Sequence, residues 1–174
     1  MADTFCVERR DRFNNEKDLE IQRRVEKSMK TGSYKTIYDV CVSLHNSFNS
    51  RSGKLLETSI EEILTTRKIP FLRQVSVKNG IISPKKRGAV HDIIIDAKLG
   101  DNIRDKVMIS CKTSVRDRYK QDGKIDAKKL YLFTYDRPSD FEKYIEVGIT
   151  LITIGNGALE AIMTELAEQF AEQS

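Results

Sequence analysis

The 174-residue chain is 39% apolar and 32% charged, with a formal net charge of +4 and a pI near 8.9. This length supports one sizeable hydrophobic core, so a single domain is expected. No apolar run approaches the roughly 18 residues of a membrane span, and three widely spaced cysteines without a CxxC pair indicate neither a zinc cluster nor a disulfide framework. We therefore expect a soluble, cytoplasmic protein whose mild basic excess alone hardly favours nucleic acid.

The first third of the chain has helical periodicity. Spaced apolar residues predict an exposed helix over residues 15–29. Two amphipathic helices are expected to follow on either side of the sequence NSRSG, one through Ile37 and Phe48 and one through Leu55 and Leu64. We expect residues 1–49 to form a helical N-terminal extension and residues 50–174 to form the core of the domain.

From residue 71 onward the sequence contains short runs of β-branched or aromatic residues, which predict five strands. They are FLRQVSV (71–77), AVHDIIIDA (89–97), KVMISCK (106–112), KLYLFTY (129–135) and ITLITI (149–154). Helices are expected over 114–121, 139–147 and 158–170. Three successive strands favour an antiparallel meander and the later alternation favours a parallel crossover, so we predict an α/β fold with a mixed five-stranded sheet flanked by helices.

Asp92 opens one predicted strand and Lys112 closes the next. Their midpoint lies in the turn LGDNI, so an antiparallel hairpin would make them cross-strand neighbours. Ser110 and Lys112 share a face in any register, because side chains alternate with period two. Such a pair is often only a structural ion pair, but a helix packed on this hairpin can bring Glu57 to the same end. Two carboxylates and a lysine suit Mg²⁺ bound to phosphate.

Three short motifs occur in a fixed order: Ser-Arg-Ser-Gly-x-x-x-Glu (50–57), His-Asp (91–92) and Ser-Cys-Lys-Thr-Ser (110–114). Within an αβββαβ order they resemble the PD-(D/E)XK nuclease superfamily, over about residues 50–155, and the run SCKTSVRDRYKQ is similar to stretches of type II restriction endonucleases. The resemblance implies a restriction-endonuclease-like core and a Mg²⁺-dependent, sequence-specific endonuclease. It also implies double-stranded DNA as the substrate and a homodimer as the active form.

The resemblance implies that Asp92 binds the metal and that Lys112 acts on the reacting phosphate. Glu57 and Asp126 are further candidate metal ligands, although a helix glutamate can also orient a ligand or simply be solvated. Two positions depart from the family pattern. His91 stands in place of a proline that does no chemistry, whereas Ser110 stands in place of an acid, and a hydroxyl is a much weaker metal ligand than a carboxylate.

Some restriction enzymes of this superfamily supply the missing carboxylate from the following helix. Asp117 and Asp126 are available for this role, five and fourteen residues after Lys112, and the pattern does not decide between them. We expect at least one of Glu57, Asp117 and Asp126 to place a carboxylate oxygen within roughly 6 Å of the Asp92 carboxylate, so that the two can share an ion.

Basic residues flank this site in the sequence, where they suit the neutralisation of phosphates. They are Lys85, Lys86, Arg87, Arg116, Arg118 and Lys120. Arg116 and Arg118 can equally pair with neighbouring acids on a solvated helix face. Two alternative functions stay open: a repair or junction-resolving nuclease of the same fold, and a catalytically silent nucleic-acid-binding module, which the missing acid at Ser110 favours.

Overall fold

The computed structural model describes residues 1–84, 91–112, 126–136, 141–146 and 148–171. Its helices are α1 (Ala2–Thr31), α2 (Tyr34–Thr66), α4 (Glu142–Glu146) and α5 (Ala158–Ala171), with a short 3-10 helix η1 (Ile103–Asp105). Its strands are β1 (Phe71–Lys78), β2 (Ile81–Ser83), β3 (His91–Ile95), β4 (Val107–Cys111), β5 (Lys129–Thr134) and β6 (Ile149–Thr153). In these ranges no helix is both long and apolar enough to cross a membrane.

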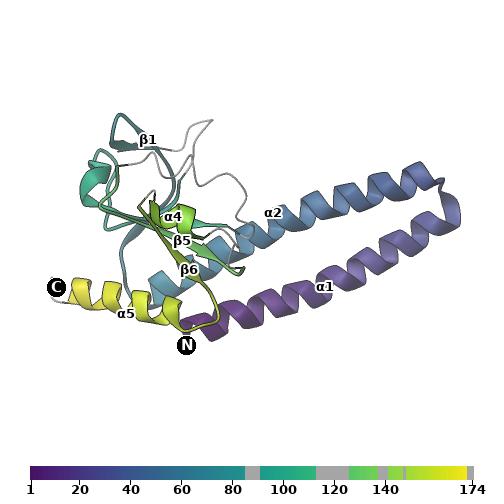
Figure 1. The fold of residues 1–174 in the computed structure, drawn as a ribbon, viewed down its shortest axis with the longest axis horizontal. Helices are drawn as coiled ribbons and strands as arrows, with labels where there is room; N and C mark the ends of the chain where they lie inside the picture. The colour runs from purple at the N-terminus through teal and green to yellow at the C-terminus, as the bar shows by residue number, and fades with distance from the viewer. Residues whose placement is uncertain (85–90, 113–125, 137–140, 147, 172–174) are drawn as a thin grey trace.

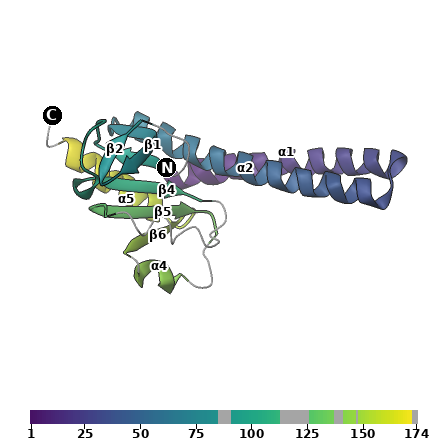
Figure 2. The same ribbon diagram turned by 90° about the horizontal axis from the view of Figure 1, so that it is seen from above.

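Helices α1 and α2 form an antiparallel hairpin that extends well beyond the sheet (Figures 1 and 2). In this arm Phe13, Leu44 and Phe48 form a small cluster, with the two phenylalanine rings edge to face at 6.1 Å. The helix break expected at NSRSG is wrong, because α2 continues through it. A helical Gly53 costs only about 1 kcal/mol, and buried residues on both sides of it, Phe48 and Leu56, favour one continuous helix.

The sheet has six strands in the order β2-β1-β3-β4-β5-β6. The pairs β1–β2, β1–β3 and β3–β4 are antiparallel, whereas β4–β5 and β5–β6 are parallel. The predicted α/β class and the mixed sheet are confirmed. The expected strand count was one too low, because β2 has only three residues between the turn at Gly80 and Pro84. Of the expected helices, 158–170 corresponds to α5, 139–147 contains α4, and 114–121 lies outside the described residues.

Hydrophobic clusters cover both faces of the sheet. On one face Ile93, Ile95 and Ile109 pack with residues of α1, α2 and α5. On the other face Ile94 and Met108 form a second cluster, which includes a tyrosine of α4. Because both faces are covered, all five residues of β3 are buried.

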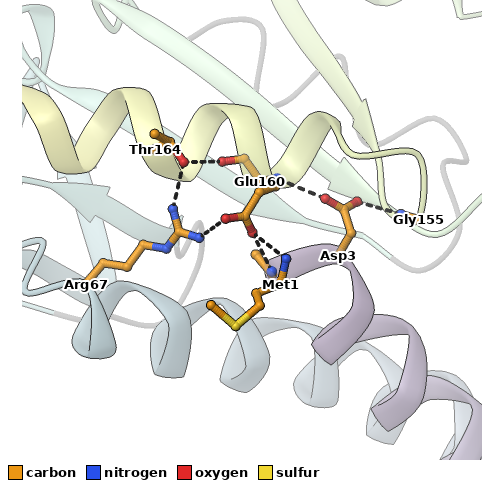
Figure 3. A network of polar contacts seen from close by, with 7 residues as sticks. Met1, Asp3, Arg67, Gly155, Glu160 and Thr164 are labelled. Carbon is orange, nitrogen blue, oxygen red and sulfur yellow. Dashed lines mark hydrogen bonds and ion pairs between the residues drawn. The ribbon is translucent and has the colours of Figure 1, made fainter.

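Hydrogen bonds and ion pairs connect the start of α1 to α5 (Figure 3). Asp3 is buried and accepts the backbone N–H groups of Gly155 at 2.7 Å and Glu160 at 2.9 Å, which satisfies a donor in the first turn of α5. Glu160 in turn accepts the backbone N–H of Ala2 and the guanidinium of Arg67. The Ala2 hydrogen bond, followed by that of Arg67, lowers the pKa of Glu160 from 4.5 to about 2.

We expect Glu160→Gln to destabilise the protein at pH 7 but hardly at pH 2. A carboxylate whose pKa is depressed by folding stabilises the folded state above its unfolded pKa, and this contribution is lost as the pH falls from 4.5 to about 2. Thermal unfolding of both proteins from pH 7 to pH 2 measures the difference. Glu168→Gln, at an exposed position of the same helix, is the matched control and should leave the melting temperature unchanged. A difference that persists undiminished at pH 2 would contradict this account.

Candidate active site

The pairing of β3 with β4 brings Asp92, Ser110 and Lys112 together. Ile93 pairs with Ile109, and the same register continued by one residue sets Asp92 opposite Ser110. Lys112 follows two residues later on the same face, diagonal to Asp92. The sequence pattern therefore identified the two neighbours, although its midpoint estimate placed them directly opposite each other.

One oxygen of Asp92 is the centre of this arrangement. Asp92 Oδ2 accepts the backbone N–H of Cys111 at 2.8 Å, the Lys112 ammonium at 3.0 Å and the Ser110 hydroxyl at 3.3 Å. The Asp92 side chain is only 10% exposed, and a carboxylate buried to this extent requires such donors to offset its lost hydration. Among the residues that the structure describes, all the donors to Asp92 contact Oδ2 and none contacts Oδ1.

Glu57 supplies a second carboxylate from α2. It is half-buried, and its Oε2 accepts a hydrogen bond from Gln74 Nε2 of β1 at 3.1 Å. Burial raises the pKa of Glu57, the negative charge of Asp92 raises it further, and the positive charge of Lys112 lowers it. The two carboxylates are therefore close enough to repel each other, and Lys112 offsets part of this repulsion.

Asp126 lies elsewhere. It precedes β5, whose parallel pairing sets Lys129 beside Val107 at the start of β4, whereas Lys112 follows the end of that strand. There Asp126 is exposed and its carboxylate pairs with the Arg104 guanidinium at 2.8 Å. A parallel crossover returns the chain to the opposite end of the sheet, so the structure does not bring Asp126 to Asp92, and the expectation that it supplies the missing carboxylate is not met.

Several predicted site residues lie outside the described residues. They are Asp117 and the basic residues Lys85, Lys86, Arg87, Arg116, Arg118 and Lys120. Gln74 is a residue of the site that the sequence analysis missed. The sequence contains no local signal for it, because its role depends on the packing of β1 against α2.

The donor set of this site suits a hard divalent cation. The described residues contain no cluster of three or more His, Cys, Asp or Glu side chains able to hold a metal. Asp92 and Glu57 nevertheless offer two carboxylates, and Mg²⁺ is commonly bound by one or two carboxylates together with water and substrate oxygens. The mutual repulsion of these carboxylates is a further reason why a cation fits here. The residues present therefore fit Mg²⁺.

We expect Asp92→Asn to lower the pKa of Glu57 and Lys112→Met to raise it. The first change removes a negative charge that disfavours ionisation of Glu57, and the second removes a positive charge that favours it. NMR titration of the glutamate carboxyl carbons in metal-free protein measures both shifts, with Glu57→Gln to assign the signal. If neither substitution moves the pKa of Glu57, the three side chains do not form one electrostatic unit.

Comparisons with known proteins relate the chain to a family. Residues 13–139 match the family model described as EcoRII C terminal. The type II restriction enzyme SsoII of Shigella sonnei is 27% identical over 106 residues, which cover 58% of this chain and 35% of that protein. The chain thus corresponds to about a third of that relative's length.

A solved structure supports the same fold. The complex of restriction endonuclease PspGI with its substrate DNA matches with a TM-score of 0.51 at 15% sequence identity. The match covers 83% of this chain and 60% of the PspGI chain. The chain therefore has the restriction-endonuclease-like fold.

Proposed function

This chain belongs to the EcoRII C-terminal family, and on that premise we propose that it is a Mg²⁺-dependent endonuclease that cleaves double-stranded DNA at specific sites. The observation that supports this proposal most directly is the contact of the Lys112 ammonium with the buried Asp92 carboxylate, within electrostatic reach of Glu57. Its two named relatives are type II restriction enzymes, and one of them was solved with its substrate DNA.

In this proposal each side chain has a separate task. Asp92 and Glu57 would hold Mg²⁺, which when bound polarises a phosphoryl oxygen as a Lewis acid. Ser110 and the Cys111 N–H orient the Asp92 carboxylate. Lys112, held by Asp92, offsets the negative charge that develops on the reacting phosphate and orients the attacking water. Hydrolysis leaves a 5′-phosphate and a 3′-hydroxyl.

The proposal extends to partners and domain organisation. Cleavage of both strands of a palindrome requires two sites related by a twofold axis, so we propose a homodimer. The six basic residues near positions 85–87 and 116–120 are proposed to contact DNA phosphates. Residues 1–49 are proposed to form an extension and residues 50–174 the catalytic core. Helix α2, which carries Glu57, is continuous across this boundary.

The second candidate is a catalytically silent DNA-binding module. Ser110 in place of an acid favours it, as does the position of Asp126 beside Arg104. Incubation of the pure protein with plasmid DNA and Mg²⁺ separates the two candidates, because only a nuclease nicks the DNA. Sequencing of the ends, and a panel of plain, mismatched and branched duplexes, then separates a restriction enzyme from a repair or junction-resolving nuclease of the same fold.

Lys112→Ala should abolish cleavage while DNA affinity stays within a few fold. The ammonium acts on one reacting phosphate, whereas overall affinity is distributed over many phosphate contacts. Plasmid cleavage and fluorescence anisotropy measure the two effects. Lys106→Ala is the matched control, because Lys106 pairs with Asp101 at the other end of β4 and should be dispensable for cleavage. Cleavage retained in the Lys112 variant would remove the central claim.

Asp92→Ala should also stop cleavage, in this case through lost metal affinity. DNA binding without metal should be unchanged or tighter, because a negative charge near the phosphates is removed. Cleavage measured against Mg²⁺ concentration tests this. Asp126→Ala is expected to cleave normally, since Asp126 pairs with Arg104 away from the site. An Asp92 variant with the Mg²⁺ dependence of the wild type would show that Asp92 is not a ligand.

A further inference from the structure

We propose that Gln74 is a positioning residue that holds the Glu57 carboxylate in place as the second metal-binding group beside Asp92. The inference rests on the function proposed above and adds to it a residue outside the motifs. Gln74 lies in β1, and its side-chain amide donates to Glu57 Oε2 at 3.1 Å. It thus links the central sheet to helix α2 at the candidate site.

The register of the sheet places Gln74 directly beside Asp92. Arg73 pairs with Ile93 and Val75 with His91, so the position between these two pairs sets Gln74 opposite Asp92. This is the one position in the run 71–75 at which the β1–β3 pairing is interrupted. The interruption therefore falls at the position that lies opposite Asp92 in the register.

The backbone explains the interruption. Gln74 has a φ of +50°, in the left-handed region that side chains other than glycine rarely adopt. Residues two apart in a strand normally share a face, but Arg73 bonds Glu61 of α2 whereas Val75 packs in the cluster on the opposite face of the sheet. The left-handed residue thus breaks the alternation.

As a result, two consecutive side chains of β1 contact the same helix. Arg73 contacts Glu61 at 3.1 Å and Gln74 contacts Glu57, one helical turn earlier. Glycine would adopt this backbone conformation without strain, and strained conformations of other residues gather at functional sites. A glutamine at this strained position indicates that its side chain has a role, and the side chain contacts Glu57.

With the hydrogen bond from Gln74, each of the two carboxylates has one oxygen that accepts hydrogen bonds from the protein. Lys112 and the Cys111 N–H occupy Oδ2 of Asp92, and Gln74 occupies Oε2 of Glu57. Within the described part of the chain, no donor contacts Oδ1 of Asp92 or Oε1 of Glu57. An ionised carboxylate only accepts hydrogen bonds, so the Gln74 NH₂ fixes one oxygen and orients the other. Loss of such an orienting partner typically costs 10–100-fold in metal affinity.

Gln74→Gly tests this inference, because it removes the amide while relieving the backbone. Mn²⁺ serves as the probe, and its binding to the whole protein without DNA is followed by electron paramagnetic resonance. We expect the Kd for Mn²⁺ to rise about tenfold or more, with a melting temperature equal to or above that of the wild type. A purely structural role predicts unchanged Mn²⁺ affinity. Gln74→Asn, which tolerates the left-handed conformation but is one methylene shorter, should also bind Mn²⁺ more weakly.

A double-mutant cycle shows whether Gln74 acts through Glu57. In a Glu57→Gln background, Gln74→Gly should have no further effect on Mn²⁺ affinity, because the oriented carboxylate is already absent. Arg73→Ala is the matched control, since Arg73 contacts the same helix through Glu61 and should leave Mn²⁺ affinity unchanged.

The outcomes separate this inference from the proposed function. Wild-type Mn²⁺ affinity in the Gln74 variants, together with lost affinity in Asp92→Ala, overturns only the role of Gln74. Additive effects in the double mutant overturn it as well. A wild-type protein that binds no Mn²⁺ overturns both the inference and the metal site on which it rests.

Discussion

The candidate site depends on one buried oxygen, Asp92 Oδ2. A carboxylate that is 10% exposed loses most of its hydration. Three donors replace it: a backbone N–H and a hydroxyl from β4, and the ammonium of Lys112 just after this strand. This requirement also constrains the sheet, because a shift of the β3–β4 register by one residue would turn Asp92 to the opposite face. The same contacts that stabilise the carboxylate therefore fix the position of Lys112.

The packing around β3 and β4 supports this geometry. Both faces of the sheet are covered, so the strands that carry the site are held by hydrophobic clusters on either side. Cys111 connects the site to the core, because its backbone N–H donates to Asp92 while its buried side chain packs in the hydrophobic cluster. Burial, followed by the charges of Asp92 and Glu57, raises the pKa of the Cys111 thiol well above its ordinary value, which keeps the thiol neutral.

The second carboxylate belongs to a different part of the fold. Glu57 comes from the helix α2, which also forms half of the projecting arm (Figure 1). Its half-buried position beside Asp92 is electrostatically unfavourable without a cation or Lys112. Three separate elements, α2, β1 and the β3–β4 hairpin, thus converge on this site. A serine at position 110 is consistent with such a site, because its hydroxyl donates to Asp92 while the second acid comes from the helix.

Local patterns in the sequence determined much of this protein. Period-two and β-branched runs identified five of the strands, helical spacing identified α5, and the placement of Asp92 and Lys112 at the ends of successive strands identified them as neighbours. Each of these inferences depends on residues close together in the chain or on a short hairpin, where spacing dictates geometry. The continuity of α2 and the short strand β2 were missed, because burial overrode a weak helix break and three residues carry little periodicity.

Only the tertiary structure separated Glu57 from Asp126. The sequence offered Glu57, Asp117 and Asp126 as partners of Asp92, and Asp117 lies outside the described residues. The parallel pairing of β4 with β5 sets Asp126 at the far end of β4, whereas packing of α2 brings Glu57 within electrostatic reach of Asp92. The sequence did not indicate a role for Gln74, because that role also depends on the tertiary structure. Its side chain reaches α2 because a single backbone angle departs from the strand conformation. No local propensity for glutamine favours a left-handed conformation, so the surrounding packing must impose it.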